Sequence, residues 1–335
     1  MKFLKGLAIL VVALLILGVI GVGTVIGWPV FFGPKSRALT DRKFDSTPER
    51  LKRGAYLAEH VAACMDCHTP FETGASGPEA TAPKLGSGQI FPDEGLPGLL
   101  VAPNLTPDPE TGIGSWSDDQ LARAIREGVG HDGRALFPLM PYLHYRQMSD
   151  EDLASLVVYL RALPPVRHPL PSTNIRFPVK YFMRTLPQPV GQVAQPDVST
   201  PVNRGKYLVN IAACADCHTR PNHGKPAPGL EFAGGRNFTG PWGVVTSANI
   251  TPDPTGIANY TDDTFLKALR TGYVGTRQLN TLMPWQNYAG QTEEDLKAIF
   301  AYLKTLSPVT HRVDNSKPGT ACRKCGMVHG GGDAN

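Results

Sequence analysis

The sequence predicts an all-α protein in which two similar helical domains stand in tandem after an N-terminal transmembrane helix. Three observations lead to this prediction: a long apolar stretch lies near the N-terminus, a segment of about 110 residues occurs twice, and each copy carries helix-start signals followed by apolar stripes. Neither copy shows a good strand pattern. We therefore expect five parts, at residues 1–34, 46–165, 166–201, 202–310 and 311–335.

Composition limits the classes of partner. The chain has 335 residues, which is enough for two domains, and 19% of them are charged with a net charge of +4. A positive charge this mild does not indicate a surface for nucleic acid. We expect no nucleic acid partner.

Residues 1–34 predict a membrane anchor. No charged residue occurs from Gly6 to Pro34, and the core from Leu7 to Ile26 has the roughly 20 apolar residues that cross a bilayer as a helix. Aromatic residues follow where an interfacial belt would lie, at Trp28, Phe31 and Phe32. The alternative is a cleaved signal peptide, but the apolar stretch is long for one and no A-x-A-like site follows it. We expect the helix to be retained.

Helix signals recur in the same order in both units. In the first unit, one helix begins at Thr47-Pro48 and runs into Cys64, a second runs from Ser117 to Gly128, and the last begins at Ser149. The second unit repeats the last two signals at Thr261 to Gly272 and at Thr292. The last helices carry matching stripes at i, i+3, i+4 and i+7: Leu153, Leu156, Val157 and Leu160, then Leu296, Ile299, Phe300 and Leu303.

Both units begin with the same longer motif. Arg53-Gly-Ala-Tyr-Leu is followed after six residues by Cys64-Met-Asp-Cys-His68, and Arg204-Gly-Lys-Tyr-Leu after five residues by Cys214-Ala-Asp-Cys-His218. C-x-x-C-H is the attachment site of a c-type haem, and one copy is expected by chance only about 0.003 times at this composition. Two copies inside a longer repeat predict two covalently attached haem c groups.

The spacing of the motif fits this chemistry. Cysteines at i and i+3 of a helix share one face and can form thioethers with two vinyl groups on one porphyrin edge, and a histidine at i+4 can bind the iron. The predicted residues are Cys64, Cys67 and His68 in the first unit and Cys214, Cys217 and His218 in the second. A zinc site would need a fourth ligand beside a crowded Cys-His pair, and a thioredoxin-like redox pair gives no reason for a histidine to follow twice.

The remaining axial position of each iron separates an electron carrier from a ligand-binding enzyme. Met-Pro-aromatic sequences, beginning at Met140 and Met283, precede the last helix of each unit. We predict these two methionines as the sixth ligands; the alternative is that they fill the core. His131, His144 and Met148 are rival ligands in the first unit, but they have no counterparts in the second, so we expect solvated or structural roles for them.

Residues 166–201 predict a semi-rigid linker. Residues 164–201 contain nine prolines and no convincing period. Four residues of this segment are expected to cover local core, the alternative being that they pack across a domain face: Phe177, Tyr181, Phe182 and Met183.

The tail at 311–335 is expected to be flexible. It holds a third C-x-x-C pair, Cys322 and Cys325, without a following histidine. We expect a local disulfide there, and the alternative is a metal site with His329.

On these motifs the chain resembles the multi-haem cytochrome c subunits of bacterial membrane-bound dehydrogenases, such as the alcohol and gluconate dehydrogenase cytochromes. The similarity covers roughly residues 50–165 and 203–308 and rests on R-G-x-Y-L before C-x-x-C-H, N-[LI]-T-P-D and L-M-P-[YW]. It implies two tandem cytochrome c domains of class I type, in which the loops of Asn104 and Asn249, with Trp116, would line the haem edges. Those subunits typically carry three haem groups, whereas this chain has motifs for two.

The resemblance also implies a function and a place. Because c-type cytochromes of this kind receive haem outside the cytoplasm, the folded part would face the periplasm from the bacterial inner membrane. The protein would take electrons from a dehydrogenase or quinol-linked complex, its redox partner, and pass them toward a terminal acceptor of the respiratory chain. The alternative is a haem enzyme of the peroxidase or thiosulfate-oxidising type, with one exchangeable iron ligand. We expect a non-catalytic electron-transfer protein.

Overall fold

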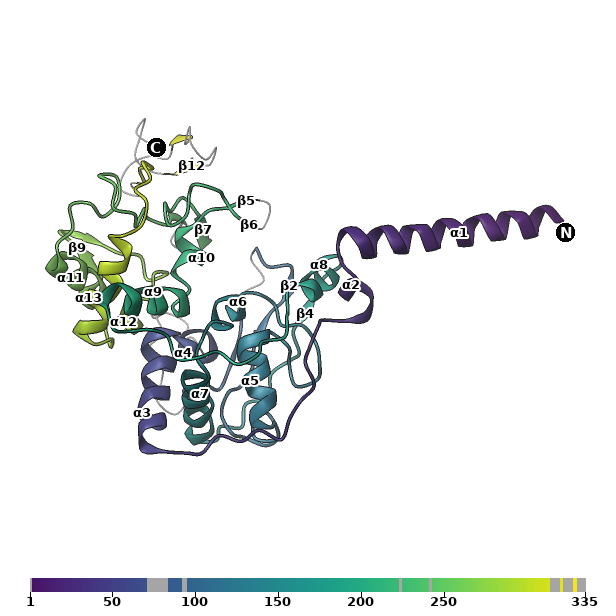
Figure 1. Ribbon diagram of the computed structural model, residues 1–335, viewed down its shortest axis with the longest axis horizontal. Coiled ribbons are helices and arrows are strands. Elements are labelled where there is room, and N and C mark those ends of the chain that lie inside the picture. The colour runs from purple at the N-terminus through teal and green to yellow at the C-terminus, as the bar shows by residue number, and fades with distance from the viewer. Residues whose placement is uncertain are drawn as a thin grey trace.

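The computed structural model describes residues 2–70, 84–91, 95–222, 225–240, 243–313, 320–321 and 328–329. Figure 1 shows one long N-terminal helix, α1 (Lys2–Val25), extending away from two groups of helices that lie against each other. Helix α1 has the length and apolar composition of a membrane span, with a mean hydropathy of 2.9, and is followed by the short helix α2 (Pro29–Phe32). Cys322 and Cys325 lie outside the described residues.

The helices form two units with the same order of elements. The first unit contains α3 (Pro48–Tyr56), the π-helical turn η1 (Leu57–Val61), α4 (Cys64–His68), α5 (Asp118–Glu127), α6 (Tyr142–Tyr145) and α7 (Asp150–Ala162). The second unit contains α9 (Pro201–Ile211), α10 (Cys214–His218), α11 (Asp262–Thr271), α12 (Trp285–Tyr288) and α13 (Glu293–Leu303). Between them lie α8 (Val179–Phe182) and the 3₁₀ turn η3 (Met183–Thr185).

Short antiparallel strand pairs join the loops, so the all-α prediction is correct only in part. Within the described ranges the pairs are β1 (Gln89–Ile90) with β3 (Val101–Ala102), β2 (Gly98–Leu99) with β4 (Asn174–Ile175), β5 (Pro221–Asn222) with β6 (Lys225–Pro226), β7 (Asn237–Gly240) with β8 (Gly243–Thr246), β9 (Tyr273–Val274) with β10 (Arg277–Gln278), and β11 (Thr320–Ala321) with β12 (Val328–His329). They satisfy backbone N–H and C=O groups of long connections, which have no helix to do so.

The predicted helix signals are confirmed. Each N-cap side chain accepts a hydrogen bond from the backbone N–H three residues later, at Thr47, Ser117, Ser149, Thr261 and Thr292. Gly128 and Gly272 end α5 and α11 in the left-handed conformation that glycine adopts without a steric penalty. The two apolar stripes are buried, with every side chain at most 5% exposed.

The approach to the first C-x-x-C-H motif differs from the prediction of one continuous helix. Ala63 adopts a left-handed conformation, with φ 48°, and separates α4 from the preceding turn; Ala213 does the same before α10, with φ 52°. A non-glycine residue in this region is strained, and such strain clusters at functional sites. The π-helical turn η1 accommodates the one additional residue that the first unit has before its cysteines.

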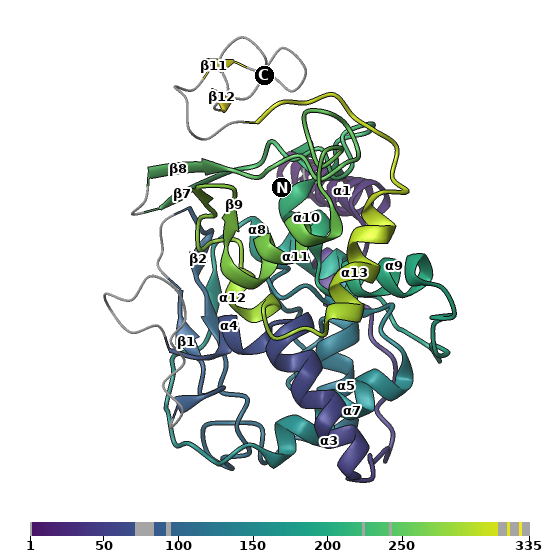
Figure 2. The same cartoon turned by 90° about the vertical axis from the view of Figure 1, so that its left-hand side faces the viewer.

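The glycine of each R-G-x-Y-L motif lets two helices meet at their backbones. A Cβ on Gly54 would collide with the carbonyl oxygen of Ser155 in α7, and a Cβ on Gly205 would collide with that of Ala298 in α13. Figure 2 shows α3 beside α7 and α9 beside α13. The first and last helices of each unit therefore cross at a distance that only glycine permits.

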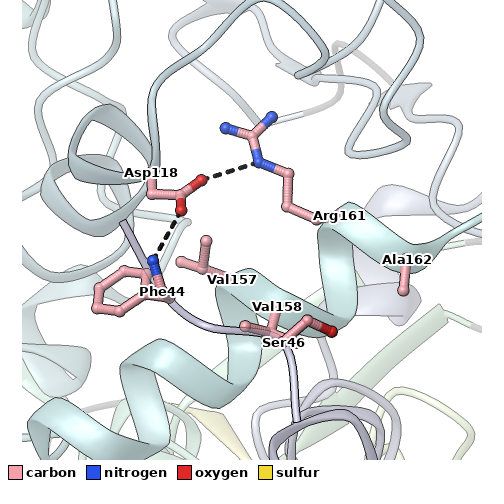
Figure 3. Close-up of a pocket in the computed structure, with 7 residues that line it drawn as sticks. All are labelled: Phe44, Ser46, Asp118, Val157, Val158, Arg161 and Ala162. Carbon is pink, nitrogen blue, oxygen red and sulfur yellow. Dashed lines mark hydrogen bonds and ion pairs between the residues drawn. The ribbon is translucent and has the colours of Figure 1, made fainter. Parts of the chain in front are cut away.

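Residues 33–47, the tether between α2 and the first unit, are bound along α5. Arg37 donates to Asp119 at 2.7 Å and to Glu127 at 2.7 Å, and the backbone N–H of Thr40 also donates to Asp119. Figure 3 shows the next part of the tether, where Phe44 and Arg161 both donate to Asp118 beside a cavity of about 280 Å³.

The Asp119 contacts make stability depend on pH. Burial raises the pKa of Asp119, but hydrogen bonds from Arg37 and Thr40 outweigh burial and lower it to about 2. Because the folded-state pKa is below the unfolded value, the stabilisation is complete above about pH 5 and is lost as the pH falls toward 2. We expect Asp119→Asn to cost roughly 2 kcal/mol at pH 7 and to flatten the acid limb of the stability curve. Denaturant titrations at several pH values measure this. The control is Asp263→Asn at the matching, exposed position of α11; an equal loss there would contradict the assignment.

Residues 174–186 of the predicted linker pack against the first unit. Strand β4 pairs with β2, and Ile175 and Met183 belong to a small buried cluster with Leu100 and Ala135. Met183 covers local core as predicted. The prediction is wrong for Phe177, Tyr181 and Phe182, which are exposed because the inward positions of this segment are taken by Ile175, Val179 and Met183.

Candidate haem sites

The predicted proximal histidines are buried and oriented in the same way. His68 Nδ1 donates to the carbonyl oxygen of Pro103 at 2.8 Å, and His218 Nδ1 donates to that of Ala248 at 2.7 Å. A proton on Nδ1 leaves the lone pair of Nε2 for a metal, the usual arrangement of a ligating histidine. Burial lowers the pKa of both rings, although the backbone hydrogen bonds act in the opposite direction, so both are neutral near pH 7.

The N-[LI]-T-P-D loops hold these carbonyl groups in place. Asn104 follows Pro103, accepts from the backbone N–H and hydroxyl of Thr106, and donates to the carbonyl oxygen of Val166 at 2.7 Å. Asn249 follows Ala248 and makes the same three contacts, with Val309 in the place of Val166. Each buried asparagine therefore ties the loop behind a histidine to the chain that leaves the last helix. Trp116, which the family resemblance places at a haem edge together with these loops, is half-buried. Its ring centre lies 4.2 Å from that of His131.

The four predicted attachment cysteines do not form disulfides. Burial raises the pKa of Cys64, Cys67 and Cys214 to about 12 and also raises that of Cys217. A reactive redox pair requires a lowered thiol pKa, so this environment argues against thioredoxin-like chemistry. Cys64 and Cys214 pack against the main hydrophobic cluster, as thioether carbons would.

The two methionine loops have the same backbone geometry. Pro141 has φ −81° and ψ 45°, Pro284 has φ −77° and ψ 52°, and each lies in a tight turn in which the methionine carbonyl accepts from the aromatic residue two positions on. Met140 and Met283 are half-buried and pack against the same hydrophobic cluster as Cys64 and Cys214. The structure thus brings each predicted sixth ligand to the cluster that its cysteines border.

The aromatic residues that follow Met-Pro are a second feature that is compatible with a bound haem. Tyr142 packs on Gly128 and Trp285 packs on Gly272, where a Cβ would collide with either ring. Within the described part of the chain, the buried Tyr142 hydroxyl and Trp285 indole N–H have no hydrogen-bond partner. A buried donor without a partner is costly, and the carboxylate edge of a porphyrin would satisfy it. Sequence reasoning missed this pairing of glycine and aromatic side chain, although both residue types recur at matching positions.

The rival ligands of the first unit make other contacts. Met148 is fully buried in the hydrophobic cluster, and His131 is exposed and stacks on Trp116. His144 Nε2 donates to Asp216 of the second C-x-x-C-H motif at 2.6 Å. Burial lowers the pKa of His144, but the Asp216 contact outweighs this and raises it overall.

Each C-x-x-C-H motif contacts the methionine loop helix of the other unit. His144 of α6 binds Asp216 of α10, and the side chain of Asn287 of α12 lies beside the Asp66 carboxylate of α4, where it acts to lower the pKa of that carboxyl against the larger opposite effect of burial. The backbone carbonyl of Asn287 also accepts from His60 Nδ1 at 3.1 Å. The two candidate sites therefore face each other across the interface between the units.

A tyrosine of the second unit completes a cluster in the first. The Tyr207 hydroxyl donates to Asp152 at 2.7 Å and accepts from the backbone N–H of Ser149 at 3.1 Å. Asp152 also receives two hydrogen bonds from Arg53, at 2.8 and 2.9 Å. Burial is the main cause of the raised pKa of Tyr207, so the hydroxyl remains a donor at neutral pH.

The reciprocal cluster lies in the second unit. The Tyr56 hydroxyl donates to Asp295 and accepts from the backbone N–H of Thr292, while Arg204 donates to Asp295. Burial raises the pKa of Tyr56 to about 12, and the Asp295 contact adds to this. Arginine and tyrosine of R-G-x-Y-L thus have different partners: the arginine binds its own unit and the tyrosine binds the other. The contact is self-complementary, like that of a twofold dimer.

Two family models match the chain, one for each unit. Residues 49–160 match cytochrome c oxidase, cbb3-type, subunit III, and residues 202–307 match cytochrome c. A diheme cytochrome c-type from Cereibacter sphaeroides is 30% identical over 261 residues, which are 74% of this chain and 83% of that protein.

Two dehydrogenase subunits are also similar. The cytochrome c subunit of alcohol dehydrogenase (quinone) from Gluconacetobacter polyoxogenes is 28% identical over 284 residues, 79% of this chain and 58% of the relative. A nicotinate dehydrogenase subunit from Pseudomonas putida is 37% identical over 184 residues, 51% of this chain and 14% of the relative. The chain thus spans little more than half of the alcohol dehydrogenase subunit and a small part of the nicotinate dehydrogenase subunit.

The duplicated helical units and their two C-x-x-C-H motifs define a tandem cytochrome c that binds haem c. The chain belongs to the cytochrome c family. Its relatives include a diheme cytochrome and the cytochrome subunits of alcohol, fructose and gluconate dehydrogenases.

Proposed function

We propose that the protein is a membrane-anchored periplasmic dihaem cytochrome c that carries electrons from a dehydrogenase or quinol-linked complex toward a terminal acceptor. Haem c, when bound, supplies a one-electron iron couple. Cys64 and Cys67 would attach one haem and Cys214 and Cys217 the other. His68 with Met140, and His218 with Met283, would be the axial ligands.

The observation that carries this proposal is the reciprocal contact between the two sites. His144 of the first unit binds Asp216 in the C-x-x-C-H motif of the second, and the backbone carbonyl of Asn287 of the second unit accepts from His60, which precedes the motif of the first. Electron transfer slows steeply with distance, so a relay requires its two centres to be held close together. One continuous hydrophobic cluster runs through both units, from Leu57 and Leu156 to Leu208 and Leu296, and fixes their spacing.

The assignment of partners rests on the relatives. Several are named as cytochrome subunits of dehydrogenases, and α1 has the length to hold the chain at a membrane. An electron-transfer subunit needs no substrate pocket at its iron, and two protein ligands on each iron would leave none. A dehydrogenase or a quinol-linked complex in the same membrane is therefore the donor that we propose.

Cysteine variants of the full chain in its native membrane test the proposal. Cys64→Ser/Cys67→Ser and Cys214→Ser/Cys217→Ser should each remove one of two covalent haem groups, measured by intact mass, because a thioether cannot form on serine. Either change should also abolish reduction of the terminal acceptor after the dehydrogenase substrate is added.

The matched control is the third pair of the same spacing. Cys322→Ser/Cys325→Ser should keep both haem groups and the full rate of acceptor reduction. Loss of a haem in this control, or a haem retained after both cysteines of a predicted site are replaced, would contradict the site assignment. An unchanged rate in either site variant would contradict the relay.

A further inference from the structure

Exposed aromatic side chains gather in two segments that lie far apart in the sequence. Trp28, Phe31 and Phe32 follow α1, and Phe177, Tyr181 and Phe182 belong to the segment around α8. Phe32 and Phe177 are each 82% exposed. In the described part of the chain, the other exposed aromatic residues are Phe3, within α1, and Tyr273.

The α8 segment is rigidly held by the first unit, and its aromatic residues point outward as a result. Val179 and Met183 turn into the small buried cluster, and strand β4 just before them pairs with β2. Phe177 and Tyr181 lie one helical turn apart and contact each other, with ring centres 6.1 Å apart. It is unfavourable for a fixed backbone to hold aromatic rings in water, because their apolar surface stays exposed. This arrangement indicates an apolar environment for the rings.

The two aromatic segments are in direct contact. Arg184 donates to the carbonyl oxygen of Val30 at 3.0 Å and stacks on Tyr181, with its guanidinium 4.5 Å from the ring centre. The methyl group of Thr185 lies beside Gly27. Figure 1 shows α8 next to α2 at the inner end of α1. The α8 segment therefore lies at the same depth as the residues that leave the proposed membrane span.

Composition favours lipid as the occupant of this surface. Tryptophan and tyrosine prefer the level of the headgroups, where the ring is apolar and the N–H or hydroxyl is wet. Lys35 and Lys180 are exposed beside the two aromatic segments, where they can bind anionic headgroups. A 24-residue helix is about 36 Å long, so the rings beyond its end would lie at the boundary of the hydrocarbon core.

We propose that Trp28, Phe31, Phe32, Phe177, Tyr181 and Phe182 form one membrane-docking surface that inserts into the headgroup region of an anionic bilayer. This inference rests on the proposed membrane anchoring by α1. It adds a second attachment, made by a segment some 150 residues later in the chain. Because the Arg37 contacts bind the tether to α5 and α8 is packed on the same unit, the surface fixes the orientation of the first haem site relative to the membrane.

Photochemical labelling by lipid tests the surface. The full chain is placed in nanodiscs of phosphatidylcholine and phosphatidylglycerol that contain a diazirine-bearing lipid, irradiated, and digested for mass spectrometry. We expect lipid adducts in α1, in residues 28–32 and in residues 177–182, and none at Tyr273. Adducts in α1 without adducts in 177–182 would overturn the docking surface and leave the anchor standing. An absence of adducts in α1 would overturn the anchor and the surface together.

A substitution that leaves Tyr181 in place gives an independent measurement. Phe177→Ser/Phe182→Ser should raise the hydroxyl-radical oxidation rate of Tyr181 in the same nanodiscs at least threefold. The double variant should insert less into the headgroup region, so that Tyr181 becomes more exposed to water. Tyr273 should be unaffected, which also reports that the fold is intact. The matched control is Val244→Ser, a change at an exposed apolar residue of β8. Equal Tyr181 rates in the double variant and the wild type would contradict the proposal.

Discussion

Replacing Gly205 by alanine is expected to destabilise the protein by about 3 kcal/mol, the upper part of the range for an overpacked core. The added Cβ would lie well inside van der Waals distance of the carbonyl oxygen of Ala298 and the Cβ of Tyr302. Backbone cannot give way as a flexible side chain can, so α9 must move away from α13. That movement would also displace Tyr207, which binds Asp152 of the other unit.

Denaturant unfolding, followed by circular dichroism and by haem absorbance, measures the effect. Gly54→Ala should cost a similar amount, because the same contact recurs between α3 and α7. The control is Gly191→Ala, where a Cβ meets no atom within 4 Å, and a change within about 0.5 kcal/mol is expected. A loss at Gly205 no larger than at Gly191 would contradict the proposed helix crossing.

Replacing Met283 by histidine is expected to lower the reduction potential of one haem on the order of 0.2 V, within the roughly 0.8 V that axial ligands span. A thioether stabilises ferrous iron more than a second imidazole does, so its loss favours the ferric state. Met283→Ala should remove half of the methionine-to-iron charge-transfer absorption of the ferric protein in the near infrared. Met140→Ala should remove the other half.

Redox titration and near-infrared spectroscopy check both expectations. Met148→Leu is the control, since Met148 is a buried methionine of the first unit that packs in the hydrophobic cluster. It should leave the potentials and the near-infrared absorption unchanged. An unchanged spectrum in Met283→Ala would show that Met283 does not bind the second iron. Absence of the band at one haem of the unaltered protein would favour a haem enzyme with an exchangeable ligand over a simple electron carrier.

Local features were predictable because they depend on residues close in sequence. Caps at Thr47, Ser149 and Thr292 need only a side chain and an amide three positions on. The apolar stripes need only the helical period. The break at Ala63 was not predictable, because nothing in an alanine indicates a left-handed backbone. The same left-handed conformation recurs at Ala213, before the short helix of the second C-x-x-C-H motif.

Long-range features needed the tertiary structure. R-G-x-Y-L occurs twice in the sequence, but nothing in it indicates that Tyr56 and Tyr207 each bind the opposite unit. Spacing along one chain does not specify which of the two copies a side chain will contact. The outward direction of Phe177 and Phe182 was likewise set by which neighbours occupied the small core. Proline content alone described that segment as a linker.

The sequence by itself determined the class of protein, its duplication and its candidate ligands. Haem attachment and helix periodicity depend on residues only three to seven positions apart, so both can be recognised in the sequence. Only the tertiary structure decided that the two C-x-x-C-H motifs face each other, that the tether is bound along α5, and that α8 lies beside the end of α1. Those arrangements come from contacts between residues up to some 240 positions apart, such as Tyr56 with Asp295. Such contacts form only where the packing of both units brings complementary groups together, which no local pattern specifies.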